Sequence, residues 1–166
     1  LYSRPCAREK VPGTDFRARL RIQMPVVVIG AANLDLSGTP DAALRAGDSN
    51  PGRIAVSPGG VGRNIAENLK RLGRNVSLVT VLGDDLYAGL IRDHSRRVGI
   101  DLQYSLTEPG CRTSAYLCIN GPDGDLSVAV SDMSICEKLT PEKLVVVDLD
   151  NHVVEGDLNP SSDTKT

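Results

Sequence analysis

SPGGVGRNIAENLKRLGRNVSLVTVLGDD, residues 57–85, carries the pattern that decides the fold of this chain. Gly59 and Gly60 end an extended run, and apolar residues then recur at the spacing of one helical face: Ile65, Ala66, Leu69 and Leu72. Gly73 stands where helices typically stop. The apolar run 75–82 then predicts a buried strand. Strand, glycine turn, helix and strand in this order predict a βαβ unit.

The glycine turn has two interpretations. Because Gly59 and Gly60 lack Cβ atoms, the backbone can approach a small ligand, and the free N–H groups of the helix point to the same place. Asn64, in the first helical turn, offers a donor and an acceptor, which suits sugar hydroxyls. The other interpretation is a tight turn without a ligand, because glycine motifs alone are weak evidence for a site. Polar residues are expected outside the apolar helical face: Glu67, Lys70, Arg71 and Arg74.

A second polar pair follows the first apolar strand of the chain. The run 24–29 is β-branched, ends at Gly30 and predicts a central buried strand. Asn33 and Asp35 come next, where ligands bind in open α/β sheets, beyond the carboxyl ends of the strands. Residues two apart in an extended chain point the same way, so both side chains could bind vicinal hydroxyls. The alternative is that Asp35 caps a turn.

The remaining elements follow from the same rules. We expect a strand over 53–57, a helix over 86–98 with Leu90, Ile91 and Val98 facing the core, and a strand over 100–104. The alternating segments on either side of the turn at 121–124 predict a hairpin over 112–130. His94 lies among charged residues and is expected to be solvated, without a chemical role.

Composition narrows the class of protein. The chain has 166 residues, a net charge of −2, one Phe and no Trp, which argues against a nucleic-acid or membrane surface. The four cysteines form no C-x-x-C pair, and two histidines are too few for a zinc site, so no metal is expected. Reduced thiols indicate the cytoplasm. Residues 1–24 are expected to be a disordered or non-native leader; an organelle-targeting peptide is the alternative.

The motifs together resemble the N-terminal signature of the ribokinase-type (PfkB) carbohydrate kinases. PGGVGRNIAENLKRLG followed by VTVLGDD matches that signature, and IGAANLD, DSNPGR and RTSAYL support it. The variant G-V-G-R-N-I-A-x-N-L resembles the pseudouridine kinases more than ribokinase or fructokinase. The match runs over about 25–144. It implies a ribokinase-like, Rossmann-type parallel sheet flanked by helices, with a small β lid, truncated after the N-terminal half.

The resemblance also implies a set of sugar contacts. These residues are Asn33, Asp35, Gly59, Gly60 and Asn64, with Asp132 as a secondary candidate beside a plain loop aspartate. ATP and Mg²⁺ are the cofactors of the family, and their site, the anion hole and the catalytic Asp come mostly from the C-terminal half. The G-A-G-D type motif of that half is absent from this sequence. We therefore expect no catalytic residue in this chain and no turnover by the chain alone.

The tail differs from the rest of the chain. Residues 25–147 are expected to form the N-terminal part of a kinase domain, and 148–166 a separate tail. VVVDLDNHVVEGDLNPSSDTKT, residues 145–166, resembles a segment of the ribulose-phosphate 4-epimerases of the class II aldolase family. The metal-binding H-x-H of that family is absent here. Locally, the tail predicts a hairpin about residues 150–151.

Three functions follow, in order of preference. The first is the sugar-binding half of a kinase that phosphorylates a ribosyl 5'-hydroxyl of a sugar or nucleoside. The second is a non-catalytic binding or dimerisation module with a truncated kinase fold, in which the exposed lid strands pair two copies as a homodimer. The third is a fusion related to the epimerases and aldolases, which rests on the tail. A small-molecule partner is expected in the first case, and neither nucleic acid nor a membrane in any.

Overall fold

The computed structural model describes residues 25–144 and 153–156. The expected leader, residues 1–24, and most of the tail lie outside these ranges. The elements are β1 Val26–Ile29, β2 Asn33–Pro40, β3 Gly52–Gly59, α2 Val61–Arg71, β4 Val76–Val79, β5 Val81–Leu82, α3 Leu86–Val98, β6 Leu106–Thr107, β7 Ala115–Asn120, β8 Leu126–Asp132, the 3₁₀ helix η1 Ser134–Lys138, α4 Pro141–Leu144 and β9 Val153–Gly156.

A parallel sheet of order β4-β1-β9 forms the centre of the body. Val26 pairs with Val76 on one side and with Val153 on the other, both in parallel register. The predicted pairing of the two central strands is therefore confirmed. The first arm of the expected tail hairpin lies outside the described residues, and the backbone of its second arm, β9, pairs with β1 in the sheet.

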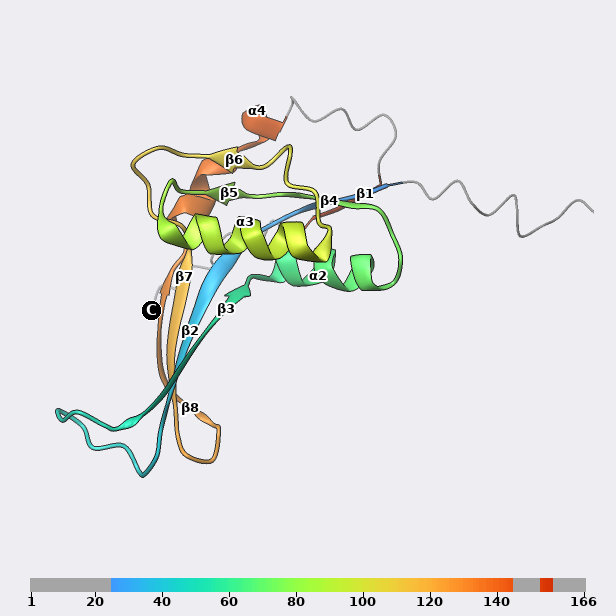
Figure 1. Ribbon diagram of the computed structural model, residues 1–166. Coiled ribbons are helices and arrows are strands. Elements are labelled where there is room, and N and C mark those ends of the chain that lie inside the picture. Colours follow the sequence, from blue (N-terminus) through green and yellow to red (C-terminus); the bar gives the residue numbers. More distant parts are fainter. Residues whose placement is uncertain (1–24, 145–152, 157–166) are drawn as a thin grey trace, which may run out of the picture.

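The two long helices lie beside each other on the body (Figure 1). In α2, Gly60 precedes the helix with φ 97°, and Gly73 follows its end with φ 79°. Asp85 caps α3 by accepting a hydrogen bond from the Ala88 N–H at 2.9 Å, and Gly99 ends that helix in the left-handed conformation. Both glycine stops agree with the sequence pattern, because only glycine adopts positive φ without steric cost.

The hydrophobic core lies between the body sheet and these helices. Val28, Leu78 and Ile91 are at most 1% exposed, and Ala66 of α2 packs in the same cluster. Each apolar side chain buried to this degree contributes about 1.5–3 kcal/mol.

Three expectations for the helix faces were wrong. Leu72 comes after the last turn of α2 and is exposed, and Leu90 of α3 is exposed as well. Glu67, expected on the polar face, is buried against α3, where it meets His94. His94 is accordingly half-buried and paired through its ring nitrogen, in contrast to the solvated side chain predicted.

The strand expected over 100–104 is also absent as such. Asp101 makes an isolated parallel bridge to Ser77, and its Oδ1 accepts a hydrogen bond from the Gln103 N–H, which turns the chain. The strand forms later, as β6, and pairs in parallel with β5. The run predicted as one strand over 75–82 divides at Thr80, whose N–H and C=O bond Ser105 and Leu106.

A second sheet, of order β3-β2-β7-β8, extends away from the helices as the lid (Figure 1). It contains the predicted strand near 53–57 as β3 and the predicted hairpin as β7 and β8, so both are confirmed. Its β2–β7 pair is parallel and the other two are antiparallel. The lid is joined to the body at its base, since the chain enters β2 directly after β1.

The two faces of the lid differ because side chains alternate along each strand. Cross-strand partners share a face, so the register puts these on one side: Leu36, Ile54, Val56, Leu117, Ile119, Val128 and Val130. We call this set the apolar lid face. Asp35, Ser57, Tyr116 and Ser131 form a row on the opposite side, which we call the polar lid face.

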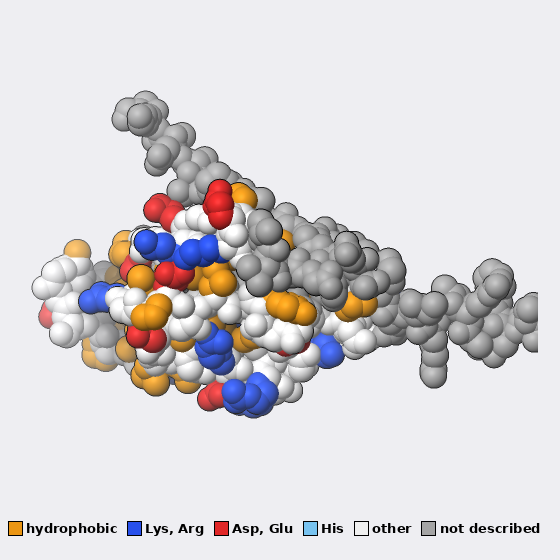
Figure 2. Space-filling model, turned by 90° about the horizontal axis from the view of Figure 1, so that it is seen from above, with side chains coloured by type: hydrophobic (Ala, Val, Ile, Leu, Met, Phe, Trp, Pro, Cys, Tyr) orange, Lys and Arg blue, Asp and Glu red, His pale blue; other side chains and the backbone are white. Residues whose placement is uncertain are grey.

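Charges are mixed on the surface seen from above, where basic and acidic side chains alternate without a continuous patch of either sign (Figure 2). Among the described residues, no helix has the length and apolar character required to cross a membrane.

Candidate sugar-binding site

The candidate site lies where β1 ends, β2 begins and α2 starts. Gly60, just before α2, and Gly62, in its first turn, fit against backbone atoms of this junction. A Cβ on Gly60 would lie 2.5 Å from the Ala31 carbonyl oxygen, and one on Gly62 would lie 2.8 Å from the Gly30 carbonyl carbon. The Arg63 N–H also donates to the Ala31 oxygen, at 3.2 Å. Glycine at these positions therefore lets the start of α2 dock onto the end of β1.

Gly59 has a different neighbour. It pairs with Asn33 across β2 and β3, and a Cβ at this position would lie 2.2 Å from Asp35 Oδ2. Any side chain at residue 59 would displace the Asp35 carboxylate. From the sequence, Gly59 and Gly60 were expected to allow the close approach of a ligand. In the structure, the close approach of Asp35 to Gly59 and of Ala31 to Gly60 already requires glycine at both positions.

A cavity of about 380 Å³ opens at this junction. The residues around it come from β2, β7, α2, the residues just before β2 and α2, and the residue after β8: Ala31, Asn33, Asp35, Gly60, Val61, Asn64, Tyr116 and Met133. Four of the six predicted contacts, Asn33, Asp35, Gly60 and Asn64, are thus brought together. Gly59 does not line the cavity and packs against the Asp35 carboxylate. Asp132 does not line the cavity; its carboxylate accepts a hydrogen bond from the Ser134 hydroxyl at 2.9 Å.

The polar groups of the cavity are already ordered by the protein. Asn33 is 4% exposed, and its Nδ2 donates to Asp35 Oδ1 at 2.6 Å, which confirms that the two side chains point the same way. On the opposite wall, Asn64 Oδ1 accepts a hydrogen bond from the Arg63 guanidinium. The first pair leaves Asp35 Oδ2 as an acceptor for a ligand.

Arg63 and Glu67 form a buried ion pair behind this wall. Arg63 is 6% exposed and Glu67 is 8% exposed, and Arg63 Nη1 lies 2.5 Å from Glu67 Oε2. Burial alone would raise the pKa of Glu67, but hydrogen bonds from His94 and Arg63, with the charges of Arg63 and Arg71, outweigh it. They hold that pKa below its usual range. Sequence analysis missed this pair because an i, i+4 Arg–Glu spacing usually indicates a solvated helix surface.

Tyr116 and Met133 were missed as well. Tyr116 stands beside Asp35 in the parallel β2–β7 register, and Met133 follows the last residue of β8. Alternation along the hairpin shows which residues share a face with Tyr116, but not which of the two lid faces that is. Its place beside Asp35 depends on the pairing of β7 with β2, which tertiary structure sets between segments far apart in the chain.

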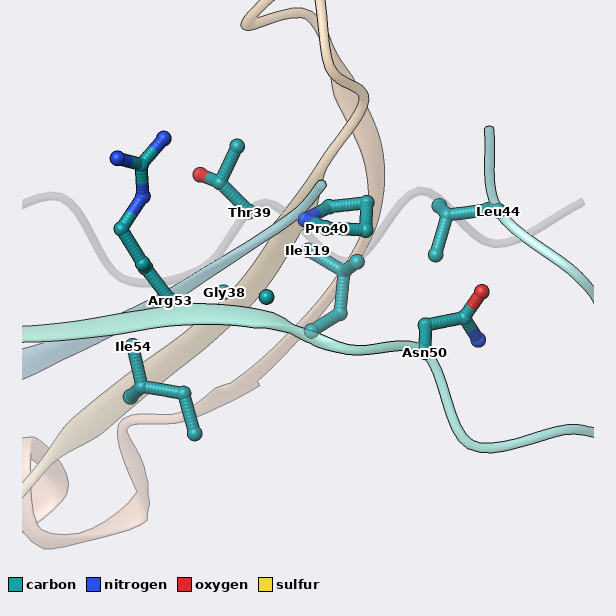
Figure 3. Close-up of a pocket in the computed structure, with 9 residues that line it drawn as sticks. Gly38, Thr39, Pro40, Leu44, Asn50, Arg53, Ile54 and Ile119 are labelled. Atoms are coloured by element: carbon teal, nitrogen blue, oxygen red, sulfur yellow. The ribbon is translucent and has the colours of Figure 1, made fainter. Parts of the chain in front are cut away.

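No group of three or more His, Cys, Asp or Glu side chains within the described ranges is arranged to hold a metal ion. A second cavity, of about 310 Å³, lies at the tip of the lid. Pro40 and Ile119 lie beside each other there, Leu44 of the loop between β2 and β3 stands apart from them, and Arg53 and Ile54 leave their strand on opposite sides (Figure 3). This cavity contains none of the predicted site residues.

The parallel body sheet, the β lid and the polar junction between them define a ribokinase-like kinase fold. The chain belongs to the pfkB family carbohydrate kinases, whose sequence model matches residues 24–166. That match includes the tail for which an epimerase resemblance was noted.

Individual relatives agree with this assignment. The chain is 41% identical over 119 residues to the pseudouridine kinase of Escherichia coli (strain K12), an alignment covering 72% of this chain and 38% of that protein. A carbohydrate kinase from Agrobacterium tumefaciens superposes with a TM-score of 0.69 at 33% identity, covering 74% of this chain and 39% of that one.

A third comparison bears on the fold alone. Arabidopsis thaliana ribokinase complexed with ribose and ATP superposes with a TM-score of 0.59 at 24% identity, over 67% of this chain and 36% of that one. This chain spans well under half the length of each of these relatives.

Proposed function

We propose that this chain forms the sugar-binding half of a kinase that transfers a phosphoryl group from ATP to the 5'-hydroxyl of a ribosyl sugar or nucleoside, with pseudouridine as the first candidate. One observation carries the proposal: Asn33, Asp35 and Asn64, from two separate segments, meet in one cavity beside the start of α2. The similarity to a pseudouridine kinase over 119 residues supports the substrate class.

The residues of this chain would bind and orient the sugar. Asp35 would accept a hydrogen bond from one hydroxyl, Asn64 would bond its neighbour, and the polar lid face would cover the ribose and exclude water. Asp132 stays a sixth proposed contact of lower weight, because its carboxylate now bonds Ser134. ATP and Mg²⁺ would supply the transferred group and its charge stabilisation. The described residues do not fit a Mg²⁺ site, since they contain no cluster of metal ligands.

Binding of pseudouridine by calorimetry tests the sugar site. Asp35→Ala should weaken binding by about 1.5–3 kcal/mol, the usual range for a hydrogen bond to a charged group. Asp93→Ala, which removes an exposed carboxylate from α3, is the matched control and should leave the affinity unchanged. Equal affinities of the wild type and Asp35→Ala would contradict the proposed site.

A second experiment addresses catalysis. An ATP-consumption assay with pseudouridine, ribose and fructose should show no turnover by this chain, because the electrostatic stabilisers of phosphoryl transfer are expected outside it. Turnover that follows the purified chain and disappears in Asp35→Ala would show that a catalytic group lies within these residues.

We also propose that the lid pairs two copies of this chain as a homodimer, which is the dimerisation role considered above. The apolar lid face is unusually exposed for a soluble domain: Ile54 is 79% exposed, Val130 64% and Val128 56%. The cavity at the lid tip adjoins it through Ile54 and Ile119.

Sedimentation velocity tests the dimer. Val130→Lys should shift the chain to the monomer, whereas Leu72→Lys, at an even more exposed apolar position on the body, should not. A monomeric wild type would rule the dimer out. Dimerisation without sugar binding would favour the non-catalytic module over the kinase.

The described part of the tail does not favour the epimerase alternative, because β9 pairs with β1 within the body sheet. We also propose a cytoplasmic location; the three cysteines among the described residues, Cys111, Cys118 and Cys136, are free thiols, which is consistent with it.

A further inference from the structure

The Arg63 side chain is enclosed by three different acceptors. Its Nε donates to the Gly59 carbonyl oxygen at 3.2 Å, its Nη1 to Glu67 Oε2 at 2.5 Å, and its Nη2 to Asn64 Oδ1. It is 6% exposed and does not line the cavity. A buried guanidinium at this position therefore contacts the glycine turn and a cavity residue at once, without reaching the ligand space itself.

Glu67 holds the guanidinium in place. Its Oε2 accepts from Arg63, and its Oε1 accepts from Arg71 Nη2 at 2.5 Å. His94 of α3 approaches the same carboxylate, with Nε2 3.2 Å from Oε2. A buried charge requires a partner of this kind, because an unpaired guanidinium in the interior is strongly unfavourable. Glu67 thereby ties the orientation of Arg63 to the packing of α2 on α3.

The chemistry of the guanidinium determines which end of the Asn64 amide faces it. Arginine has five N–H donors and no acceptor, so the atom of Asn64 that meets it must be the oxygen. The reverse amide orientation would set two N–H groups against each other. The Nδ2 group of Asn64 is consequently the part of this exposed amide that is left for a ligand, as a donor.

The opposite wall carries the complementary group. Asn33 Nδ2 bonds Asp35 Oδ1, and Asp35 Oδ2 remains as an acceptor. The cavity is therefore lined by an amide whose free end is a donor and by a carboxylate, which accepts hydrogen bonds. A hydroxyl group can satisfy both at once, since its oxygen accepts while its hydrogen donates.

We propose that Arg63, held by Glu67, is a positioning residue that locks the Asn64 amide as a donor toward the ligand, so that the site selects a hydroxyl bound between Asn64 Nδ2 and Asp35. This assignment rests on the proposed sugar-binding function. The alternative is a purely structural role of the Arg63–Glu67 pair. In that case Arg63 would stabilise α2, and its effect on ligand binding would not depend on Asn64.

A double-mutant cycle separates the two roles. Calorimetric binding of pseudouridine is measured for the wild type, Arg63→Met, Asn64→Ala and the double variant. Arg63→Met should weaken binding about tenfold in the wild-type background and less than about twofold in the Asn64→Ala background, the scale of one directed hydrogen bond. An equal loss in both backgrounds would overturn the proposal.

Arg71→Met is the matched control. It removes the other arginine on Glu67, whose side chain is 70% exposed and contacts neither Gly59 nor Asn64 in the bonds above. Its affinity should equal that of the wild type. Should Arg63→Met fail to fold, Arg63→Lys replaces it in the cycle, because lysine keeps the charge opposite Glu67 but lacks the fork that reaches Asn64.

A spectroscopic measurement works without a ligand. The Asn64 side-chain amide signal in a ¹⁵N correlation spectrum is assigned from its loss in Asn64→Ala. It should move in Arg63→Met and stay in place in Arg71→Met. If the wild type binds no pseudouridine, the proposed function fails, and this signal still decides the role of Arg63: an unmoved signal in Arg63→Met overturns it.

Discussion

The body and the lid both contain strands with valine and isoleucine, but these strands differ in what covers them. In β1 and β4 every residue is buried, because helices and neighbouring strands enclose both faces. In β3 and β8 nearly every residue is exposed or partly exposed, including valines and isoleucines. Apolar strand residues therefore stabilise the body by burial, whereas in the lid they contribute a surface.

The difference also explains where the candidate site lies. Asn33 is buried at the base of β2, whereas Asp35 and Tyr116, one step along the lid, are half-buried. The cavity thus forms at the boundary between a well-packed scaffold and a less constrained sheet. Function commonly depends on residues that a rigid scaffold holds at such a boundary.

The largest expected effect comes from a matched pair of leucines. Leu78→Ala in β4 should lower the free energy of unfolding by about 2–5 kcal/mol, because the side chain is fully buried and its loss leaves a cavity. Leu117→Ala in β7, which is 46% exposed, should cost less than about 1 kcal/mol. Urea denaturation followed by circular dichroism measures both, and equal losses would contradict the difference between body and lid.

Asp85 tests the junction of the two regions. Its carboxylate caps α3 and accepts from both the N–H and the hydroxyl of Thr113, at 2.9 and 2.7 Å, just before β7 begins. Asp85→Ala should destabilise the protein by about 1–3 kcal/mol, from the lost cap and the unpaired Thr113 groups. The neighbouring exposed Asp84→Ala is the control and should cost about 0.5 kcal/mol or less.

The contribution of Asp85 should also depend on pH. Burial alone would raise the pKa of Asp85, but hydrogen bonds from Thr113 and Ala88 outweigh it and hold the pKa below the ordinary value of 3.8. Stabilisation is therefore complete above pH 3.8 and disappears as the pH falls through the lower, folded-state pKa. The stability difference between the wild type and Asp85→Ala should shrink in that acid range; a constant difference would exclude this linkage.

The smallest effect is expected at Ser95 of α3. Its side-chain oxygen is fully buried and, among the described residues, has no hydrogen-bond partner. Ser95→Ala removes a desolvated hydroxyl with little change in volume and should be neutral or stabilising by up to about 1 kcal/mol. A thermal melt measures this, with Ser134→Ala on the surface as the comparison. A clear loss of stability would show that the hydroxyl is bonded in solution.

Much of the architecture was predictable from local pattern. The glycine stops of both helices, the two central strands and the hairpin follow from periodicity and from the few residues that tolerate positive φ. Asn33, Asp35 and Asn64 were predictable as a group because parallel strands and the following helix direct their ends to one edge of the sheet. The strand at 100–104 was not, because the Asp101 side chain accepts a hydrogen bond from the Gln103 N–H and turns the chain there.

The sequence by itself determined the family, most of the order of strands and helices, and which polar residues stand at strand ends, because these depend on neighbours within a few positions. Tertiary structure alone decided that Glu67 and His94 meet between α2 and α3, that Tyr116 stands beside Asp35, and that one lid face is left exposed. Each of these depends on contacts between segments far apart in the chain. Whether a charged or apolar side chain is buried depends on what the fold packs against it, which no local pattern specifies.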